Sequence, residues 1–164
     1  MSVAPIEVRR VSDNERARLA ALLLREWGSP QIVSRGEVHD ASRTPALICA
    51  MDDQIVGLAT YEITGDECEL LTLDAFDRGR GIGSRLLEAV IDLARSEGCR
   101  RVWLVTSNDN LDAVRFYQRR GLRLIAVHPG AIDQAREIKP TIPLVGNYGI
   151  PIRDELEFEL RLDG

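Results

Sequence analysis

A short run rich in glycine and arginine is the clearest place for chemistry in this sequence. It stands directly before a stretch with helical apolar spacing and consists of Arg78-Gly79-Arg80-Gly81-Ile82-Gly83. Glycine lets backbone amides approach an anion closely, and the first amides of a helix lack partners within the helix. Arginine adds charge in a geometry that suits phosphate. The run predicts a phosphate site, with a Gly-rich turn that merely precedes a helix as the alternative.

Two common phosphate motifs do not fit this run. A P-loop needs Lys and then Ser or Thr after its last glycine, whereas Ser84 follows Gly83 directly. The dinucleotide fingerprint G-x-G-x-x-G is met only in part, because its last position falls on Ser84 or Leu86. The sequence therefore argues against both nucleotide-binding classes.

The elements that must position this run follow a mixed α/β pattern with a largely antiparallel sheet. Gln31–Thr44 is polar and predicted to be irregular, with at most a short helical turn. The long connection Pro129–Arg153 contains a predicted short helix at Ala131–Lys139, and long ordered connections are often functional lids. Helices are predicted from the Ser12 capping box to Trp27, from Ile82 to Gly98 and from Asn110 to Gly121. Strands are predicted at Ile6–Val11, Ala46–Met51, Ile55–Ile63, Cys68–Leu73, Val102–Thr106, Leu122–Val127 and Leu156–Leu162, the last at or near a sheet edge.

Composition narrows the class of protein. The 164 residues correspond to one domain, residues 1–164, and carry a net charge of −5, which argues against a nucleic-acid partner. No apolar stretch is long enough to predict a membrane span or a signal peptide. The cysteines Cys49, Cys68 and Cys99 are widely spaced, which predicts reduced thiols in a cytoplasmic protein and no metal site.

Two motifs in order give the sequence a family resemblance. Arg78-x-x-Gly81-x-Gly83 before a helix resembles the acyl-CoA signature, Q/R-x-x-G-x-G/A, of the GNAT superfamily of N-acetyltransferases. A second signature, N-x-x-A-x-x-F-Y-x-x-x-G-F, is similar to the stretch from Asn110 to Leu122, with Leu122 in place of Phe. Residues 146–155 resemble tails of an uncharacterised branch of that superfamily. The resemblance implies a mostly antiparallel sheet of about seven strands with a splayed strand pair, flanked by about four helices.

The resemblance also implies a cofactor site. Acetyl-CoA would lie between the strands Cys68–Leu73 and Val102–Thr106, as a co-substrate and without a metal. Backbone groups of Leu71, Thr72 and Leu73 would pair with its pantetheine arm, and an amide there would polarise the thioester carbonyl. The remaining positions that the resemblance assigns to the cofactor are Arg78, Gly79, Arg80, Gly81, Ile82, Gly83, Ser84, Asn110 and Phe116.

The expected catalytic groups are a tyrosine and a glutamate. Tyr117 matches the tyrosine that in many members of the superfamily donates a proton to the leaving thiolate; packing in the core is the alternative. An ammonium acceptor must lose a proton, and Glu69 or Glu67 could take it directly or through water; a solvated strand face is the alternative. His39 is interpreted as a surface-loop histidine, and Trp27 as a core residue.

The sequence therefore predicts an acetyl-CoA-dependent N-acetyltransferase that acts on a primary amine of a small molecule, a peptide or a protein. The alternative is a non-catalytic acyl-CoA-binding sensor or interaction module on the same fold. The apolar face of Leu156–Leu162 is compatible with a homodimer.

Overall fold

The computed structural model describes residues 5–77 and 79–163, so Arg78 of the predicted phosphate site lies outside the described residues. Seven strands form one sheet in the order β1-β4-β5-β6-β7-β9-β8, and two more form a separate hairpin. The strands are β1 (Glu7–Arg10), β2 (Gln31–Ser34), β3 (Glu37–Asp40), β4 (Ala46–Met51), β5 (Gln54–Thr64), β6 (Glu67–Ala75), β7 (Arg101–Ser107), β8 (Arg123–His128) and β9 (Glu155–Arg161). The helices are α1 (Arg16–Trp27), α2 (Ile82–Ser96), α3 (Leu111–Arg119) and α4 (Ala131–Ile138), with short 3-10 turns η1 (Asp13–Glu15) and η2 (Asn147–Gly149).

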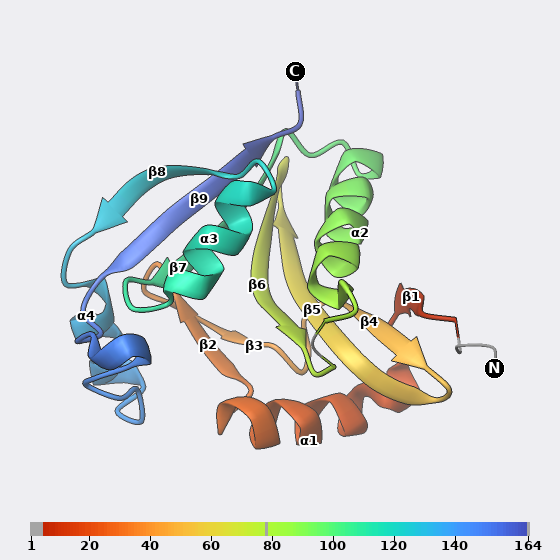
Figure 1. Ribbon diagram of the computed structural model, residues 1–164, viewed down its shortest axis with the longest axis horizontal. Helices are drawn as coiled ribbons and strands as arrows, with labels where there is room; N and C mark the ends of the chain where they lie inside the picture. The colour runs from red at the N-terminus through yellow and green to blue at the C-terminus, as the bar shows by residue number, and fades with distance from the viewer. Residues whose placement is uncertain (1–4, 78, 164) are drawn as a thin grey trace.

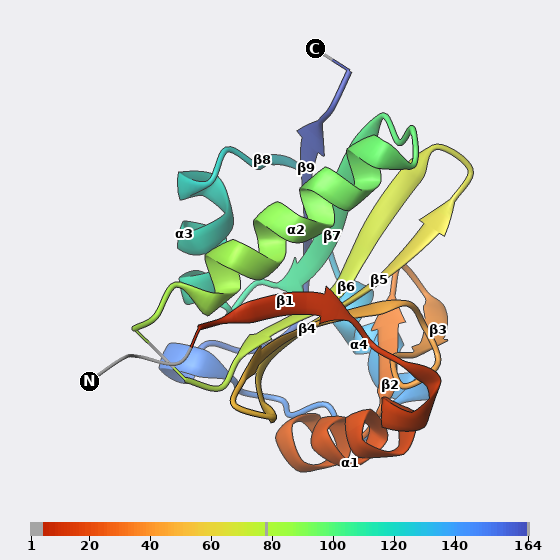
Figure 2. The same cartoon turned by 90° about the vertical axis from the view of Figure 1, so that its right-hand side faces the viewer.

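The sheet is covered on both faces (Figures 1 and 2). On one face, α2 and α3 bury a large apolar cluster that includes Leu86, Val90 and Phe158. On the other face, α1 buries Leu19 and Leu23 against β4 and β5. Successive residues of a strand face opposite sides of the sheet, and because both sides are covered, β4 and much of β5 have continuous apolar runs. The predicted mixed α/β fold with a mostly antiparallel sheet is confirmed.

Several local signals in the sequence are confirmed as well. Asp52 and Asp53 both have positive φ, as the tight turn of the β4–β5 hairpin requires. The Asn110 side chain accepts a hydrogen bond from the Ala113 amide and caps α3. The final strand β9 lies between β7 and β8, one strand from the edge of the sheet.

The prediction of an irregular segment over residues 31–44 is wrong. This segment contains the β2–β3 hairpin, which turns at Arg35 (φ 50°) and Gly36 (φ 78°). Both strands have only four residues, and β3 is mostly polar, so alternation is too short to distinguish them from a loop. The Arg35 guanidinium and amide both donate to the buried Glu155 carboxylate of β9, which fixes the hairpin beside the main sheet.

The connection from Pro129 to Arg153 is held to the body of the molecule. It contains α4, as predicted, and Arg136 of that helix donates to the backbone oxygens of Ile142 and Pro143. The buried Asp109 carboxylate accepts from the amide and the side chain of Asn147. Among the described residues, no helix is long and apolar enough to cross a bilayer.

Candidate active site

The site begins where two strands of the sheet separate. β6 and β7 are the one parallel pair among the described strands, and their pairing runs only from Glu67–Arg101 to Glu69–Trp103. Beyond this point β6 continues beside β5, and β7 continues beside β9 (Figure 1). A register shift in the β5–β6 pairing leaves Leu71 without a partner across from it, which indicates a β-bulge at the separation.

A cavity of about 170 Å³, called here the splay cavity, lies between the separated strands. Its walls combine strand residues with α1, β2, α3 and α4, so elements far apart in sequence meet here. The lining residues are Trp27, Ile32, Val33, Ser34, Leu70, Leu71, Val105, Thr106, Ser107, Asn110, Ile132 and Glu155. Trp27 is 43% exposed, and its indole donates to Asp74 at 2.9 Å, so its interpretation as a core residue is wrong.

The N-terminus of α2 offers free backbone donors, as the glycine run predicted. Gly81 is the N-cap residue in a left-handed conformation and provides no side-chain cap. The first intrahelical bond runs from the Arg85 amide to the Gly81 oxygen, so the amides of residues 82–84 have no partner within the helix. Side chains built at Gly79 and Gly81 would meet nothing within 4 Å, so the space in front of these residues is open. Arg80 forms an ion pair with Asp77 at 2.9 Å.

The N-terminus of α2 also contacts α3 closely. A Cβ at Gly83 would lie 3.4 Å from the Phe116 ring, which shows why a small residue fits there. The Arg120 guanidinium stacks 3.7 Å from the centre of that ring and donates to the Ser84 hydroxyl at 2.8 Å. Among the predicted cofactor positions, the structure therefore brings Gly79 to Ser84 and Phe116 into one neighbourhood. Leu71 lies with Asn110 in the splay cavity, while the Thr72 hydroxyl is paired with Thr60 and is buried.

Tyr117 lies on the inner side of α3, in the apolar cluster beneath α2. Its ring packs edge-on against Phe116 and is 6.2 Å from Phe158, and 8% of the residue is exposed. Burial raises the pKa of the hydroxyl, and the charge of Asp74 raises it further. The hydroxyl is therefore protonated at neutral pH and can serve only as a proton donor there. The structure places Tyr117 in this apolar cluster, and it is not among the lining residues of the splay cavity.

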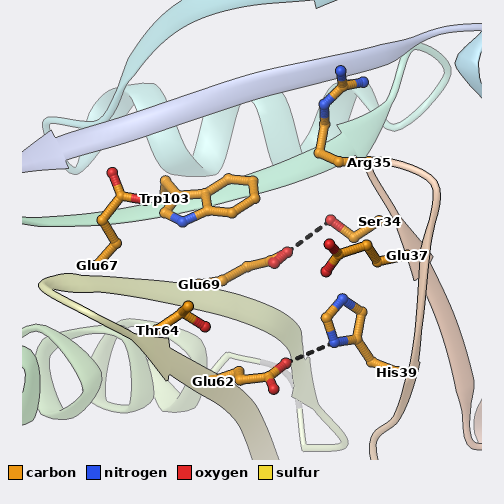
Figure 3. A pocket seen from close by; sticks show the side chains of 9 residues that line it. All are labelled: Ser34, Arg35, Glu37, His39, Glu62, Thr64, Glu67, Glu69 and Trp103. Atoms are coloured by element: carbon orange, nitrogen blue, oxygen red, sulfur yellow. Dashed lines mark hydrogen bonds and ion pairs between the residues drawn. The ribbon is translucent and has the colours of Figure 1, made fainter.

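A second cavity of about 240 Å³, called here the carboxylate pocket, lies at the start of the separation (Figure 3). The β2–β3 hairpin forms one wall, and β5, β6 and β7 form the other. Its lining residues are Ser34, Arg35, Glu37, His39, Glu62, Thr64, Glu67, Glu69 and Trp103. Ser34 lines both cavities and donates to the Glu69 carboxylate at 2.8 Å, so the two cavities adjoin at this hydrogen-bonded pair.

The two predicted base candidates have different surroundings. Burial raises the pKa of Glu69, although the hydrogen bond from Ser34 opposes the rise. Glu67 accepts hydrogen bonds from Arg101 at 2.8 Å and from Arg100 at 3.0 Å. Both guanidinium groups contact the same carboxylate oxygen of Glu67, so this side chain is already paired. Glu69 has no such guanidinium partner among the described residues and accepts from the Ser34 hydroxyl instead.

The interpretation of His39 as a surface-loop histidine is wrong. His39 lies on β3, and its side chain is 90% buried against the carboxylate pocket, with 10% exposed. Its Nδ1 lies 2.7 Å from the Glu62 carboxylate, and because a carboxylate only accepts, Nδ1 carries the hydrogen. Sequence reasoning also missed Ser34, Glu62 and Trp103. The available signal for Glu62 was the register of the β5–β6 hairpin about its turn at residues 65–66, which places Glu62 directly across from Glu69.

Comparison with known proteins agrees with this geometry. The profile described as "Acetyltransferase (GNAT) family" matches residues 13–122. "Uncharacterized protein YdhI" of Bacillus subtilis is 36% identical over 156 residues, which cover 93% of this chain and 98% of that protein. An IAA acetyltransferase from Bacillus cereus has a similar structure, with a TM-score of 0.75, 18% identity and coverage of 96% of this chain and 100% of that one. A GNAT family acetyltransferase from Elizabethkingia anophelis with acetyl-CoA bound has a TM-score of 0.69, 15% identity and coverage of 96% and 98%. The chain belongs to the GNAT acetyltransferase family.

Proposed function

We propose that residues 1–164 form one acetyltransferase domain that transfers an acetyl group from acetyl-CoA directly to a primary amine. The acceptor belongs to a small molecule, a peptide or a protein. One observation carries the proposal: the separated ends of β6 and β7 open a cavity that meets a second, carboxylate-lined cavity at the Ser34–Glu69 hydrogen bond. A two-substrate transfer needs two binding spaces that share one reacting point, and these cavities provide such a point.

The chain's own residues fit the cofactor. The free amides of residues 82–84 and the open space at Gly79 and Gly81 suit the pyrophosphate, with the positive end of the α2 dipole behind them. Arg80 adjoins Gly79 and Gly81 in the sequence, and Arg120 donates to Ser84 at the start of α2, so both can add positive charge beside the pyrophosphate. The bulge at Leu71 frees backbone groups that can pair with the pantetheine arm. Bound here, acetyl-CoA supplies an acetyl group activated as a thioester.

Glu69 is the proposed proton acceptor for the incoming ammonium. Burial raises its pKa, so its affinity for a proton is greater than that of an exposed glutamate. The Ser34 hydroxyl donates to Oε1 and thereby holds the carboxylate in one orientation. Either a direct contact or one water molecule would carry the proton from the amine to Glu69.

Tyr117 is the proposed proton donor to the departing thiolate. Its hydroxyl is protonated at neutral pH because burial raises its pKa. A positioned acid lowers the barrier for loss of a thiolate and typically raises the rate by a factor of about 10²–10⁴. The charge of Asp74, which raises the pKa of Tyr117, keeps the proton in place until the sulfur gains negative charge.

Calorimetric binding of acetyl-CoA tests the cofactor half of the proposal. We expect Gly81→Glu to abolish binding, because a carboxylate would stand at the amide cradle and repel phosphate. Gly98→Glu is a matched control: both glycines have positive φ, flank α2 and would place a Cβ in open space. Equal binding by wild type, Gly98→Glu and Gly81→Glu would refute the cradle. Binding without acetyl transfer to any amine would identify a CoA-binding module in place of an enzyme.

The proposal also covers the cellular location and the oligomeric state of the protein. We place the protein in the cytoplasm, a location supported by Cys49, Cys68 and Cys99, which are all free and buried. A homodimer through the edge strand β8 is supported by three outward apolar residues at that edge, Leu124, Ile125 and Val127. Light scattering on the wild type and on Val127→Glu tests the dimer, which the variant should dissociate.

A further inference from the structure

The charges of the carboxylate pocket do not balance. Arg100 and Arg101 neutralise Glu67, and Arg35 is paired with Glu155 of β9. Three carboxylates of the lining remain, and no Lys or Arg among residues 5–77 and 79–163 lies within ion-pair distance of any of them. They are Glu37, Glu62 and Glu69, of which Glu62 contacts His39 Nδ1 at 2.7 Å, an ion pair only when the imidazole is protonated.

This arrangement is costly without a ligand. Glu62 and Glu69 are direct cross-strand partners in the β5–β6 ladder, where like charges repel each other. The charges of Glu62 and Glu37 both act on Glu69, which is buried. A cation placed among the three carboxylates would relieve this repulsion.

His39 gives a second, independent sign that the pocket receives a ligand. Its side chain is nine-tenths buried, and Nε2 is a buried polar atom for which the described part of the chain offers no hydrogen-bond partner. Figure 3 shows the ring between Glu62 on one side and Glu37 and Glu69 on the other, with Nδ1 toward Glu62. In the tautomer with its hydrogen on Nδ1, His39 offers Nε2 as an acceptor, and an ammonium N–H would satisfy it.

From these contacts we infer that the carboxylate pocket binds a linear aliphatic diamine or polyamine as the acetyl acceptor. This inference rests on the proposed function and names the substrate class of the same site. One ammonium lies at the buried end beside Glu69, where it loses its proton. The second lies near the mouth between Glu37 and Glu62, the latter having 42% of its side chain exposed.

The pocket also offers an apolar surface against which the methylene groups of such a ligand can pack. Trp103 of β7 lines the same pocket beside Glu69, and its indole offers an apolar wall for methylene groups (Figure 3). Arg101 stacks 5.2 Å from the centre of the Trp103 ring and fixes its orientation. A cavity of about 240 Å³ is suited to a small, narrow molecule.

Binding measured by calorimetry, with the chain saturated with CoA, tests the inference without requiring turnover. The probes are 1,5-diaminopentane and 1-aminopentane, which differ only in the second ammonium. We expect the diamine to bind at least about tenfold more tightly than the monoamine, since hydrogen bonds to charged groups are the strong ones. Raised salt should reduce the difference, because part of the site is exposed.

Variants locate the second ammonium. Glu62→Gln keeps an acceptor for His39 Nδ1 but removes the charge, and Glu37→Gln removes the other charge at the mouth. Each should weaken diamine binding about fivefold and leave monoamine binding unchanged. Glu88→Gln on the exposed side of α2 is the control and should alter neither. Thermal melting of each variant confirms folding.

The outcomes separate the two proposals. Tight diamine binding that both mouth variants weaken supports the pocket assignment, whether or not acetyl is transferred. Equal binding of diamine and monoamine, or no diamine binding to the CoA-saturated chain, overturns it. Transfer to a peptide N-terminus but not to the diamine would overturn the substrate class while leaving the proposed acetyltransferase activity intact.

Discussion

Replacing Asp74 by Asn should make the protein more stable at neutral pH and remove part of the pH dependence of its stability. Asp74 lies near the end of β6, and burial raises the pKa of its carboxyl from 3.8 to about 6, while the Trp27 indole donates to it at 2.9 Å. The folded state therefore binds a proton more tightly than the unfolded state. Between about pH 4 and pH 6 the free energy of unfolding must fall as the pH rises.

The size of the effect follows from the same shift. A rise from 3.8 to about 6 corresponds to a loss of roughly 3 kcal/mol once the carboxyl is ionised in both states. Asn keeps an oxygen for the Trp27 indole and cannot ionise, although its amide needs a new partner. We therefore expect Asp74→Asn to stabilise the protein above pH 6 by roughly 2 kcal/mol, which is about 4–8 °C in Tm for a chain of this size.

Urea melts of both proteins at a series of pH values from 4 to 8 measure this difference. The gain of Asp74→Asn over wild type should be small near pH 4 and reach its full value above pH 6. Asp92→Asn, an exposed carboxylate on α2 with 79% of its side chain accessible, is the control and should give a small, pH-independent difference. A pH-independent difference for Asp74→Asn, or a gain that is largest at low pH, would refute the assignment of Asp74 as a partly buried acid with a raised pKa.

Three further predictions concern the site and its support. Tyr117→Phe should lower kcat by about 10²-fold or more and leave the calorimetric affinity for acetyl-CoA nearly unchanged; an unchanged kcat would remove Tyr117 from the proton transfer. Gly57→Ala should cost about 1–3 kcal/mol in chemical melts, because its Cβ would clash with Ile82 and lie 2.9 Å from Leu86 Cδ1; wild-type stability would show that α2 can shift away from β5. Glu69→Gln should reduce kcat most strongly below the pKa of the amine acceptor; a loss equal at all pH values would point to a positioning role.

The sequence predicts the fold of this chain well where local chemistry decides the outcome. The Ser12 capping box, the Asn110 cap and the Asp52–Asp53 turn are all present, because each depends on residues close together in the chain. The last strand also appears where alternation predicts it. The two signature motifs meet in space, with Gly83 and Phe116 in contact distance of each other.

The acceptor side of the site was not predictable in the same way. Its wall is the β2–β3 hairpin, whose short polar strands are held by Arg35–Glu155 contacts across 120 positions of sequence. No local sequence pattern predicts such a contact. The sequence therefore predicts a surface position for His39, although its side chain is buried. The pocket depends on tertiary packing, and only the structure brings His39 to Glu62.

Mass spectrometry of an amine panel after incubation with the purified chain and acetyl-CoA tests the central claim most directly. The panel should contain alkyl monoamines, diamines, free lysine and peptides with free N-termini, with released thiol measured in parallel. The account predicts an amine that gains one acetyl group for each thiol released, and loss of both signals in Glu69→Gln. Calorimetric binding of acetyl-CoA with no acetylated amine across the panel would contradict it.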